Sequence, residues 1–351
     1  MKQVNVTYEW PGGSTKYQDI YILRANHYYS FSLKSETRFF PIHERQQNKY
    51  SLVQIKNLVM AKYQLQLRYL ATLKPLVFSL TGGKDSQVSL LACSPELRDK
   101  VFAYTEVRDN DVEKAKDIAS DAKINWIGLD NGAFNFENNF HYEKFSKRLD
   151  VLAFPENIRL ALKCQFLLYN FFGRDNFFHI HSNGAETGRG RASIYALVAN
   201  EFTFENYLHQ YASFSSRYKS KEREQMTFEA IKSNPLIIKL VKHDFDCIAC
   251  SRIKELGYYP GDFAYMETRN PFLLSVIHVL NDYAFESISL TNTRDILLDM
   301  WNLPDIFTNK TNVLYNAILD NEKFGTNYSA ESINQEVFDN YGSQYIARAF
   351  F

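Results

Sequence analysis

The chain has 351 residues, 45% of them hydrophobic, so it can bury a sizeable core in one large domain with appendages or in two domains. Its 40 Lys and Arg residues balance 40 Asp and Glu residues, which leaves no global field that recruits nucleic acid or an anionic membrane. Four scattered cysteines are too few for a disulfide framework, the N-terminal segment lacks the apolar core of a signal peptide, and no apolar run approaches the roughly 20 residues of a membrane helix. We therefore expect a cytoplasmic, globular protein.

The first 73 residues predict a small β appendage followed by a long helix. Residues 4–41 alternate apolar and polar side chains around Pro-Gly-Gly and Lys-Ser-Glu-Thr breaks, a pattern typical of short antiparallel strands and hairpins. Between residues 51 and 73 apolar side chains recur at helical spacing, at Leu52, Ile55, Val59, Tyr63, Leu67 and Leu70. An amphipathic helix is therefore expected to lead into the next segment.

The segment from residue 76 to residue 182 predicts a parallel sheet with crossover helices. Short apolar runs indicate strands over 76–80, 101–107, 124–130 and 177–182. Helical patterns separate them, over 86–92, 112–119 and 157–172. Strands that alternate with helices at this spacing form an α/β fold with a doubly wound parallel sheet. From about residue 190 onward the pattern predicts helix and loop, so we expect a helical C-terminal half.

The turn after the first of these strands reads Thr-Gly-Gly-Lys-Asp-Ser, at residues 81–86. In a doubly wound sheet, ligands lie beyond the carboxyl ends of the strands, where a helix N-terminus presents unpaired N–H groups. Gly82 and Gly83 let the backbone approach an anion closely. Hydroxyls, a cation and a carboxylate accompany them, at Ser79, Thr81, Ser86, Lys84 and Asp85. The turn predicts a site for a pyrophosphate with its magnesium ion, and the alternative is an ordinary glycine turn.

The same turn resembles the pyrophosphate loop, S-G-G-x-D-S, of the ATP pyrophosphatase (adenine nucleotide alpha hydrolase) superfamily, with Thr81 in place of the first serine. The resemblance implies a HUP-like fold and an enzyme that cleaves ATP between its α and β phosphates. The Walker pattern G-x-x-x-x-G-K-[ST] is missing from this turn.

A second segment, residues 181–191 (HSNGAETGRGR), resembles the S-G-x-G-A-D-E segment of asparagine synthetase-like enzymes. In that family the acidic residue after Gly-Ala helps to bind magnesium, which implies Glu186 as the partner of Asp85. The resemblance also implies a nucleotide pocket lined by Ser182, Asn183 and Gly184, with Thr105 near the adenine or the ribose.

Two later segments resemble the same family. Residues 267–273 (ETRNPFL) resemble E-x-R-x-P-F-L-D, with Leu274 in place of the final aspartate. Residues 293–307 (TRDILLDMWNLPDIF) resemble a helix that ends in Leu-Pro. The likeness covers roughly residues 20 to 307. It implies three parts: an N-terminal β-hairpin appendage, an asparagine synthetase-like domain and a C-terminal helical extension, over residues 1–48, 49–310 and 311–351.

The resemblance implies an ATP- and magnesium-dependent ligase that forms an amide. Such an enzyme adenylates a carboxylate with release of pyrophosphate, and an amine then attacks the acyl-adenylate and releases AMP. Glu267 is the implied base for the amine, with Arg269 beside it, and a structural salt bridge is the alternative role of that pair. The family's lysine before Leu-Pro is missing, because residues 286–304 contain none, and Arg294 is the cation that remains in that stretch.

The expected partners are small. The resemblance implies a small-molecule or peptide carboxylate as substrate. Glutaminase domains of asparagine synthetases begin with a nucleophilic cysteine, whereas this chain begins Met1-Lys2 and contains no such domain, so a separate amine or ammonia donor is expected.

Two alternative functions stay open. Cys247 and Cys250 form a C-x-x-C, and some tRNA thiolases of the superfamily combine such a pair with an S-G-G-K-D-S loop, so a tRNA or small-molecule sulfur transferase is the first alternative. A buried cysteine pair explains the same residues. The missing lysine supports the second alternative, a catalytically silent nucleotide-binding partner protein. Nucleic acid is expected as a partner only under the thiolase alternative, as tRNA.

Overall fold

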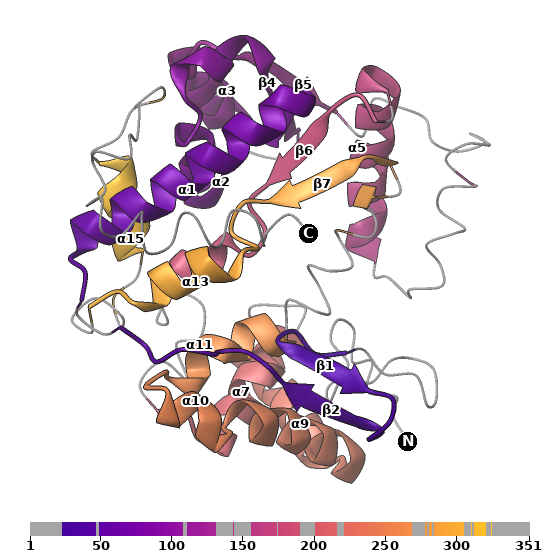
Figure 1. The fold of residues 1–351 in the computed structure, drawn as a ribbon. Coiled ribbons are helices and arrows are strands. Elements are labelled where there is room, and N and C mark those ends of the chain that lie inside the picture. The colour runs from indigo at the N-terminus through magenta and orange to yellow at the C-terminus, as the bar shows by residue number, and fades with distance from the viewer. Residues whose placement is uncertain are drawn as a thin grey trace.

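The computed structural model describes residues 23–46, 49–107, 111–130, 143, 156–173, 175–189, 201–215, 221–268, 278, 281–282, 284–304, 310, 312–320 and 324. These residues form a five-stranded sheet with helices on both faces, and a separate two-stranded sheet. Figure 1 shows the large sheet in the upper part of the molecule and the small one beside a group of helices in the lower part.

All neighbouring strands of the large sheet are parallel. Their order is β5 (Asn125–Leu129), β4 (Val101–Glu106), β3 (Leu76–Ser79), β6 (Phe178–His181) and β7 (Glu286–Ser289). The chain runs outward from β3 through β4 to β5 and then returns to β6 on the other side of β3. The strand order therefore reverses between β3 and β6, which is the topological switch point of a doubly wound sheet. The predicted α/β fold class is confirmed.

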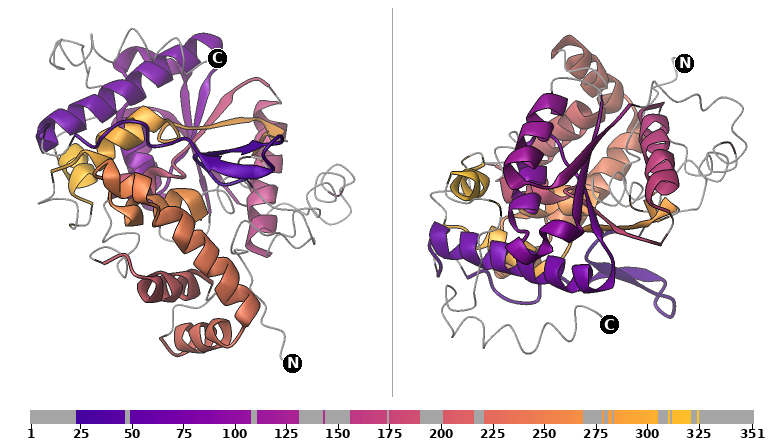
Figure 2. Two further views of the ribbon diagram at one scale, coloured as in Figure 1. Left: turned by 60° about the horizontal axis from the view of Figure 1, so that its bottom comes forward. Right: turned by 90° about the horizontal axis from the view of Figure 1, so that it is seen from above.

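The central strand β3 is buried on both faces. Leu76 and Phe78 belong to a core on one face and Val77 to a core on the other. The first core includes side chains of α1 (Leu52–Leu73), α2 (Lys84–Leu91) and α3 (Asp111–Ala122), whereas the second includes α5 (Glu156–Phe172). The right view of Figure 2 shows these helices on opposite sides of the strands. A strand that is buried on both faces has a continuous apolar sequence, so β3 could be predicted from the sequence.

One strand of the sheet departs from the sequence expectation. The pattern after residue 190 predicts helix and loop, but residues 286–289 form β7, which pairs in parallel with β6. The segment Glu-Ser-Ile-Ser has one β-branched apolar residue and little strand signal of its own. Its pairing with β6, more than 100 residues earlier in the chain, determines its conformation.

The remaining elements form a helical lobe, which we define as β1, β2 and α7 to α11. The antiparallel hairpin consists of β1 (His27–Ser30) and β2 (Ser35–Arg38), as the predicted β appendage requires; residues 1–22 of that prediction lie outside the described residues. The helices are α7 (Phe204–Ser215), α8 (Lys221–Lys232), α9 (Pro235–Ile248), α10 (Ser251–Glu255) and α11 (Pro260–Ala264). The division into three domains stays a prediction.

Helix α13 (Arg294–Trp301) lies between the sheet and the helical lobe in Figure 1. Its residues Ile296 and Met300 belong to the core beneath the sheet, whereas Leu297 and Trp301 belong to the core of the helical lobe. One amphipathic helix therefore joins both cores. A shorter helix, α15 (Val313–Leu319), packs on the sheet core through Leu314 and Ile318. None of the described helices combines the length and the apolar character that a membrane span requires.

The long helix α1 begins with a capping box. The Ser51 hydroxyl accepts a hydrogen bond from the Gln54 N–H at 3.3 Å, and the Gln54 side-chain oxygen accepts one from the Ser51 N–H at 2.8 Å. We predict that Ser51→Ala lowers the free energy of unfolding by about 1 kcal/mol, because an orphan N–H of the first turn loses its acceptor. Ser51→Asp retains an acceptor and is expected to stay close to wild type. Urea unfolding checks both variants, and equal losses would contradict the cap.

Candidate functional site

The turn between β3 and α2 is held together by its own hydroxyl groups. The Ser86 hydroxyl accepts a hydrogen bond from the Thr81 N–H at 3.0 Å and lies 3.1 Å from the carbonyl oxygens of Thr81 and Gly83. The Thr81 hydroxyl accepts one from the Gly83 N–H at 3.1 Å. The threonine that replaces the first serine of the S-G-G-x-D-S loop therefore fixes the turn through its hydroxyl.

The two glycines of the turn have different physical roles. A Cβ on Gly82 would lie 2.6 Å from Asp111 Oδ1 and 3.0 Å from Lys114 Cδ, so a side chain at this position would collide with the start of α3. Gly83 is the N-cap of α2 and supplies no side-chain acceptor, so the first N–H groups of that helix receive no cap from it. The Asp111 and Lys114 side chains therefore fill the space beside Gly82, and the helix N-terminus at Gly83 is suited to an anion.

Two lysines lie at this turn, and both have neutral partners. Lys84 Nζ donates to Asn316 Oδ1 of α15, and Lys114 Nζ donates to the Gly82 carbonyl oxygen at 2.6 Å. Lys114 was not predicted as a site residue. It stands in the first turn of α3, the helix that follows β4. A cation in the first turn of a helix after a strand of the sheet is the sequence signal that could have predicted it.

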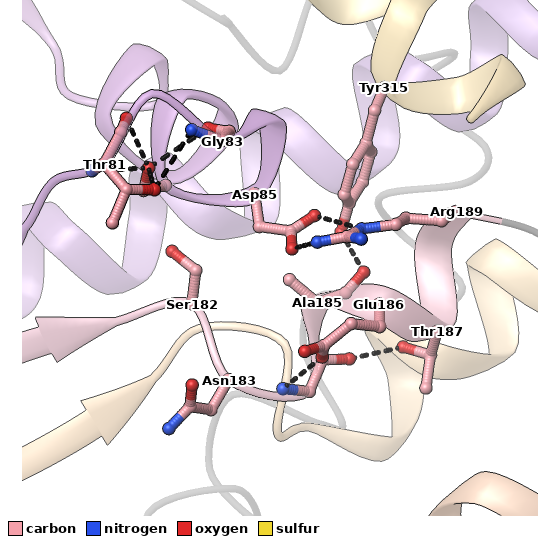
Figure 3. Close-up of polar contacts among 12 residues, drawn as sticks. Thr81, Gly83, Asp85, Ser182, Asn183, Ala185, Glu186, Thr187, Arg189 and Tyr315 are labelled. Carbon is pink, nitrogen blue, oxygen red and sulfur yellow. Dashed lines mark hydrogen bonds and ion pairs between the residues drawn. The ribbon is translucent and has the colours of Figure 1, made fainter. Parts of the chain in front are cut away.

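The turn after β6 lies across from the β3–α2 turn, as Figure 3 shows. The Ser182 and Ser89 hydroxyls are 3.0 Å apart and join β6 to α2. Gly184 has a positive φ of 87°, a conformation that favours glycine. Its N–H donates to the Glu186 carboxylate at 2.9 Å, and the Asn183 carbonyl accepts from the Ser289 hydroxyl at 2.6 Å. The predicted residues Ser182, Asn183 and Gly184 thus lie at the switch point.

The carboxylate of Asp85 is bound by an arginine that the sequence analysis did not predict. Arg189 Nε donates to Asp85 Oδ1 at 2.8 Å, and its Nη2 makes a second contact with Oδ2 (Figure 3). The Asp85 side chain is 13% exposed and the Arg189 side chain 35% exposed. Arg189 stands three residues after Glu186, at the end of the short 3-10 helix η4 (Ala185–Arg189).

The predicted magnesium pair, Asp85 and Glu186, extends from the two facing turns. Asp85 is turned toward Arg189, and Glu186 is turned toward the Gly184 N–H. Across the described ranges, no group of three or more His, Cys, Asp and Glu side chains can hold a metal ion. A magnesium role for the two carboxylates stays a prediction.

Helix α15 connects the two turns. The Tyr315 hydroxyl donates to the Ala185 carbonyl oxygen, and the Asn312 N–H donates to the Arg189 carbonyl oxygen at 2.6 Å. On the other turn, Asn316 accepts from Lys84. The segment expected to be only a C-terminal extension thus contributes contacts to both sides of the site.

Two other predicted residues make contacts within the sheet. The Thr105 hydroxyl donates to the Leu80 carbonyl oxygen at 2.7 Å and accepts from Trp126 Nε1 at 3.0 Å. Ser79 pairs with Tyr104 of β4 in the parallel register. Both residues stand at the carboxyl ends of their strands, as expected. A contact of either one with a nucleotide stays a prediction.

The predicted base, Glu267, lies in the helical lobe and is 1% exposed. Both of its carboxylate oxygens contact the guanidinium of Arg38, and Asn26 Nδ2 donates to Oε1 at 3.0 Å. These contacts favour the structural salt bridge over the base, with Arg38 as the partner. Arg269, the other candidate for that pair, lies outside the described residues.

Arg294 begins α13 shortly after β7, and therefore lies at the same edge of the sheet as the two turns. Its guanidinium carbon lies 4.8 Å from the ring centre of Phe39 and 5.8 Å from that of Phe40. Burial lowers the pKa of the Arg294 guanidinium. Its predicted catalytic role stays a prediction.

The cysteine pair lies in the helical lobe. Cys247 stands near the end of α9 and Cys250 is the N-cap of α10. Burial raises the pKa of the Cys247 thiol. The backbone carbonyl oxygen of Cys247 accepts a hydrogen bond from Arg38 at 3.0 Å. A third cysteine, Cys164, belongs to the core around α5 and therefore does not lie with this pair in the helical lobe.

A buried histidine network lies below the turn that follows β6. The His179 and His181 rings stack on one face of the strand with their centres 5.7 Å apart. His179 Nε2 is 2.8 Å from the Tyr104 hydroxyl, and its Nδ1 is 2.9 Å from the Ser287 hydroxyl. Burial lowers the pKa of His179 to about 3 and lowers the pKa of His181 well below its usual range.

The hydrogen bonds define the tautomer of His181. Its Nδ1 lies 3.1 Å from the Asn183 N–H, which can only donate, so Nδ1 must accept. In the neutral ring the proton is then on Nε2, which donates to His278 Nδ1 at 3.3 Å. The neutral imidazole therefore holds the backbone of Asn183 in place.

Comparisons with known proteins give little beyond this geometry. No family model matches the chain, and no curated protein matches its sequence. Among solved structures, it is similar to an NH3-dependent NAD synthetase from Campylobacter jejuni subsp. jejuni NCTC 11168, in complex with the nitrate ion. The identity is 18% over 59% of this chain and 96% of that chain, with a TM-score of 0.28. A TM-score that low supports no inference about activity.

The buried Glu267–Arg38 pair gives a stability prediction. We expect Glu267→Ala to lower the free energy of unfolding by about 3–5 kcal/mol, because it leaves the Arg38 guanidinium buried without its counter-ion. An Arg38→Met/Glu267→Leu double variant removes both charges and is expected to recover most of the loss.

The matched control is the exposed ion pair of Lys242 and Asp246, where Asp246→Ala is expected to change the free energy of unfolding by less than about 0.5 kcal/mol. Chemical unfolding measures all three variants. A Glu267→Ala variant as stable as wild type would contradict the structural role.

The histidine network predicts a pH dependence of stability. The folded-state pKa of His179 is lowered to about 3, so below about pH 6.5 the unfolded chain binds a proton that the folded chain does not. Stability is therefore lost as the pH falls from about 6.5 toward 3, by about 1.4 kcal/mol per pH unit for this histidine. In His179→Gln we expect the free energy of unfolding to fall less steeply with decreasing pH, by that amount, as urea unfolding between pH 7 and pH 5 measures. Parallel slopes for the two proteins would contradict this.

Proposed function

We propose that the chain binds the phosphates of ATP between the turns after β3 and β6, and that it is an AMP-forming amide ligase of the ATP pyrophosphatase kind. One observation carries this proposal. The two segments that resemble family motifs, residues 81–86 and 181–191, follow the two strands that flank the topological switch point, where doubly wound sheets bind their ligands.

The polar groups around the β3–α2 turn suit a polyphosphate. Gly83 is the N-cap of α2 and has no side chain to cap the helix, so the first N–H groups of α2 can bind a phosphate oxygen. Among the described residues, the partners of Lys84 and Lys114 are neutral, an amide oxygen and a carbonyl oxygen, which the lysines can exchange for a charged phosphate. In this proposal the turn holds the β and γ phosphates and leaves the α phosphate to be attacked.

The residues present also fit a magnesium ion that arrives with the nucleotide. Magnesium is commonly bound by one or two carboxylates together with substrate phosphates, and Asp85 and Glu186 supply two carboxylates from the facing turns. When bound, the ion neutralises charge on the departing pyrophosphate. The lysines and the helix N-terminus stabilise the same charge from the protein side.

The steps that involve the carboxylate and the amine are assigned by chemistry alone. A carboxylate is a poor electrophile, and its attack on the α phosphate gives an acyl-adenylate that an amine or ammonia opens to the amide. Arg294, the first residue of α13 and without a carboxylate partner among the described residues, is our candidate for contact with the substrate carboxylate or the adenylate. Glu267 is assigned the structural role that its contacts with Arg38 support.

The test is the identity of the products. With ATP, magnesium, ammonium ions and a panel of amino-acid and peptide carboxylates, we expect AMP and pyrophosphate in equal amounts, resolved by ion-exchange chromatography. Asp85→Asn and Lys114→Met are each expected to lower kcat/KM by about 100-fold, because each removes a group that faces the transferred charge. Asp121→Asn, an exposed carboxylate on α3, is the matched control and should behave as wild type. Release of ADP, or full activity in the Asp85 variant, would overturn the proposal.

A further inference from the structure

We propose that Arg189 is a phosphate-binding residue. It pairs with the Asp85 carboxylate until a metal-bound polyphosphate displaces it from that carboxylate. This rests on the proposed function, because it assigns a role to one more residue of the same site. In the exchange, Asp85 passes from the guanidinium to the divalent cation and Arg189 turns to a phosphate oxygen.

The contact itself makes Arg189 a competitor of a cation. The guanidinium contacts both oxygens of Asp85, so it occupies the positions at which a metal ion would bind. Bidentate arginine–carboxylate pairs are among the strongest charge-assisted contacts, and Asp85 is mostly buried. A bare cation must displace this arginine and leave its charge without a partner.

The backbone of Arg189 is held while its side chain is partly exposed. The Asn312 N–H binds the Arg189 carbonyl oxygen at 2.6 Å. At the preceding residue, a Cβ on Gly188 would lie 2.9 Å from the Tyr315 ring and 3.0 Å from Met300 Sδ, so the chain is closely packed there. The Arg189 side chain is 35% exposed and extends between the two turns (Figure 3). The guanidinium can therefore reorient about its side-chain torsions without a backbone shift.

The exchange makes the site selective for a metal–polyphosphate complex over either component. A polyphosphate alone leaves Asp85 near its negative charge, and a cation alone leaves Arg189 unpaired. The complex supplies an anion for Arg189 and a cation for Asp85 in one step. Arg189 is thus expected to oppose binding of the free cation and to favour binding of the complex.

Binding of Mn2+ and of pyrophosphate tests this prediction without catalysis. Free Mn2+ is measured by electron paramagnetic resonance, and pyrophosphate binding in the presence of Mn2+ by calorimetry. We expect Arg189→Ala to bind Mn2+ alone about tenfold more tightly and Mn2+–pyrophosphate about tenfold or more weakly than wild type. Arg189→Lys retains the charge without the bidentate geometry and should give intermediate values for both.

Two further variants complete the design. Arg252→Ala removes an exposed arginine of α10 and is expected to match wild type in both measurements. Adding Asp85→Asn to Arg189→Ala should abolish the gain in Mn2+ affinity, because Asp85 is the ligand that the arginine blocks. Circular dichroism establishes that each variant is folded.

The outcomes separate this inference from the proposed function. If wild type binds Mn2+–pyrophosphate but Arg189→Ala and Arg189→Lys change both affinities in the same direction or change neither, the exchange is wrong and the phosphate site stands. If wild type binds no Mn2+–pyrophosphate, both are wrong. A loss of folding in Arg189→Ala leaves Arg189→Lys, for which wild-type affinities in both measurements would also overturn the exchange.

Discussion

The pairing of β3 with a parallel strand on each side is the constraint on which the rest of the site depends. A strand buried on both faces has no access to water, so its backbone groups must find partners within the sheet. At the end of the strand the Leu80 N–H donates to the Tyr104 carbonyl at 2.9 Å, and the Leu80 carbonyl accepts from the Thr105 hydroxyl at 2.7 Å. The polar groups of Leu80 are thus satisfied before the turn begins. Thr81 to Ser86 then form a closed local network at a fixed point on the sheet edge.

Elements with a local signal were predictable from the sequence. The apolar runs that become β3, β4, β5 and β6 carry their own strand pattern, and the turn at residues 81–86 contains its own partners, because Thr81 and Ser86 are five residues apart. The capping residues of α1 are local in the same way. For these elements, hydrophobic period and turn chemistry agree with the fold.

What the sequence could not show depends on long-range contacts. The strand β7 exists because β6 pairs with it, and Arg189 reaches Asp85 across 104 residues of chain. Lys114 and helix α15 contact the β3–α2 turn from segments 32 and 232 residues away along the chain. Glu267 depends on a distant partner in the same way: its motif implied a base or a salt bridge, and the fold places Arg38 against it across 229 residues. A motif supplies the residue type, and the fold supplies the partner that determines its role.

The helical lobe uses charge to fix how the N-terminal hairpin docks. Arg24 binds both Glu36 on the hairpin and Asp244 on α9, and Arg38 binds Glu267 after α11. Desolvating these groups offsets much of the attraction between them, so their net contribution to stability is small compared with the loss that follows when one partner is missing. Such pairs therefore favour one docking geometry over others. Because α13 shares apolar side chains with this lobe and with the sheet, that geometry also orients Arg294 at the sheet edge.

The cations of the site differ in what they must give up to bind an anion. Lys84 is held by an amide oxygen and Lys114 by a carbonyl oxygen, and a phosphate is a better acceptor than either. Arg189 is held by a carboxylate, which already carries the charge that a phosphate would offer. A phosphate alone therefore gains little by displacing Asp85, and the displacement becomes favourable only when another cation takes the carboxylate. Under the proposed exchange, the two lysines can serve any polyanion, whereas the Asp85–Arg189 pair makes binding depend on the metal that accompanies the polyanion.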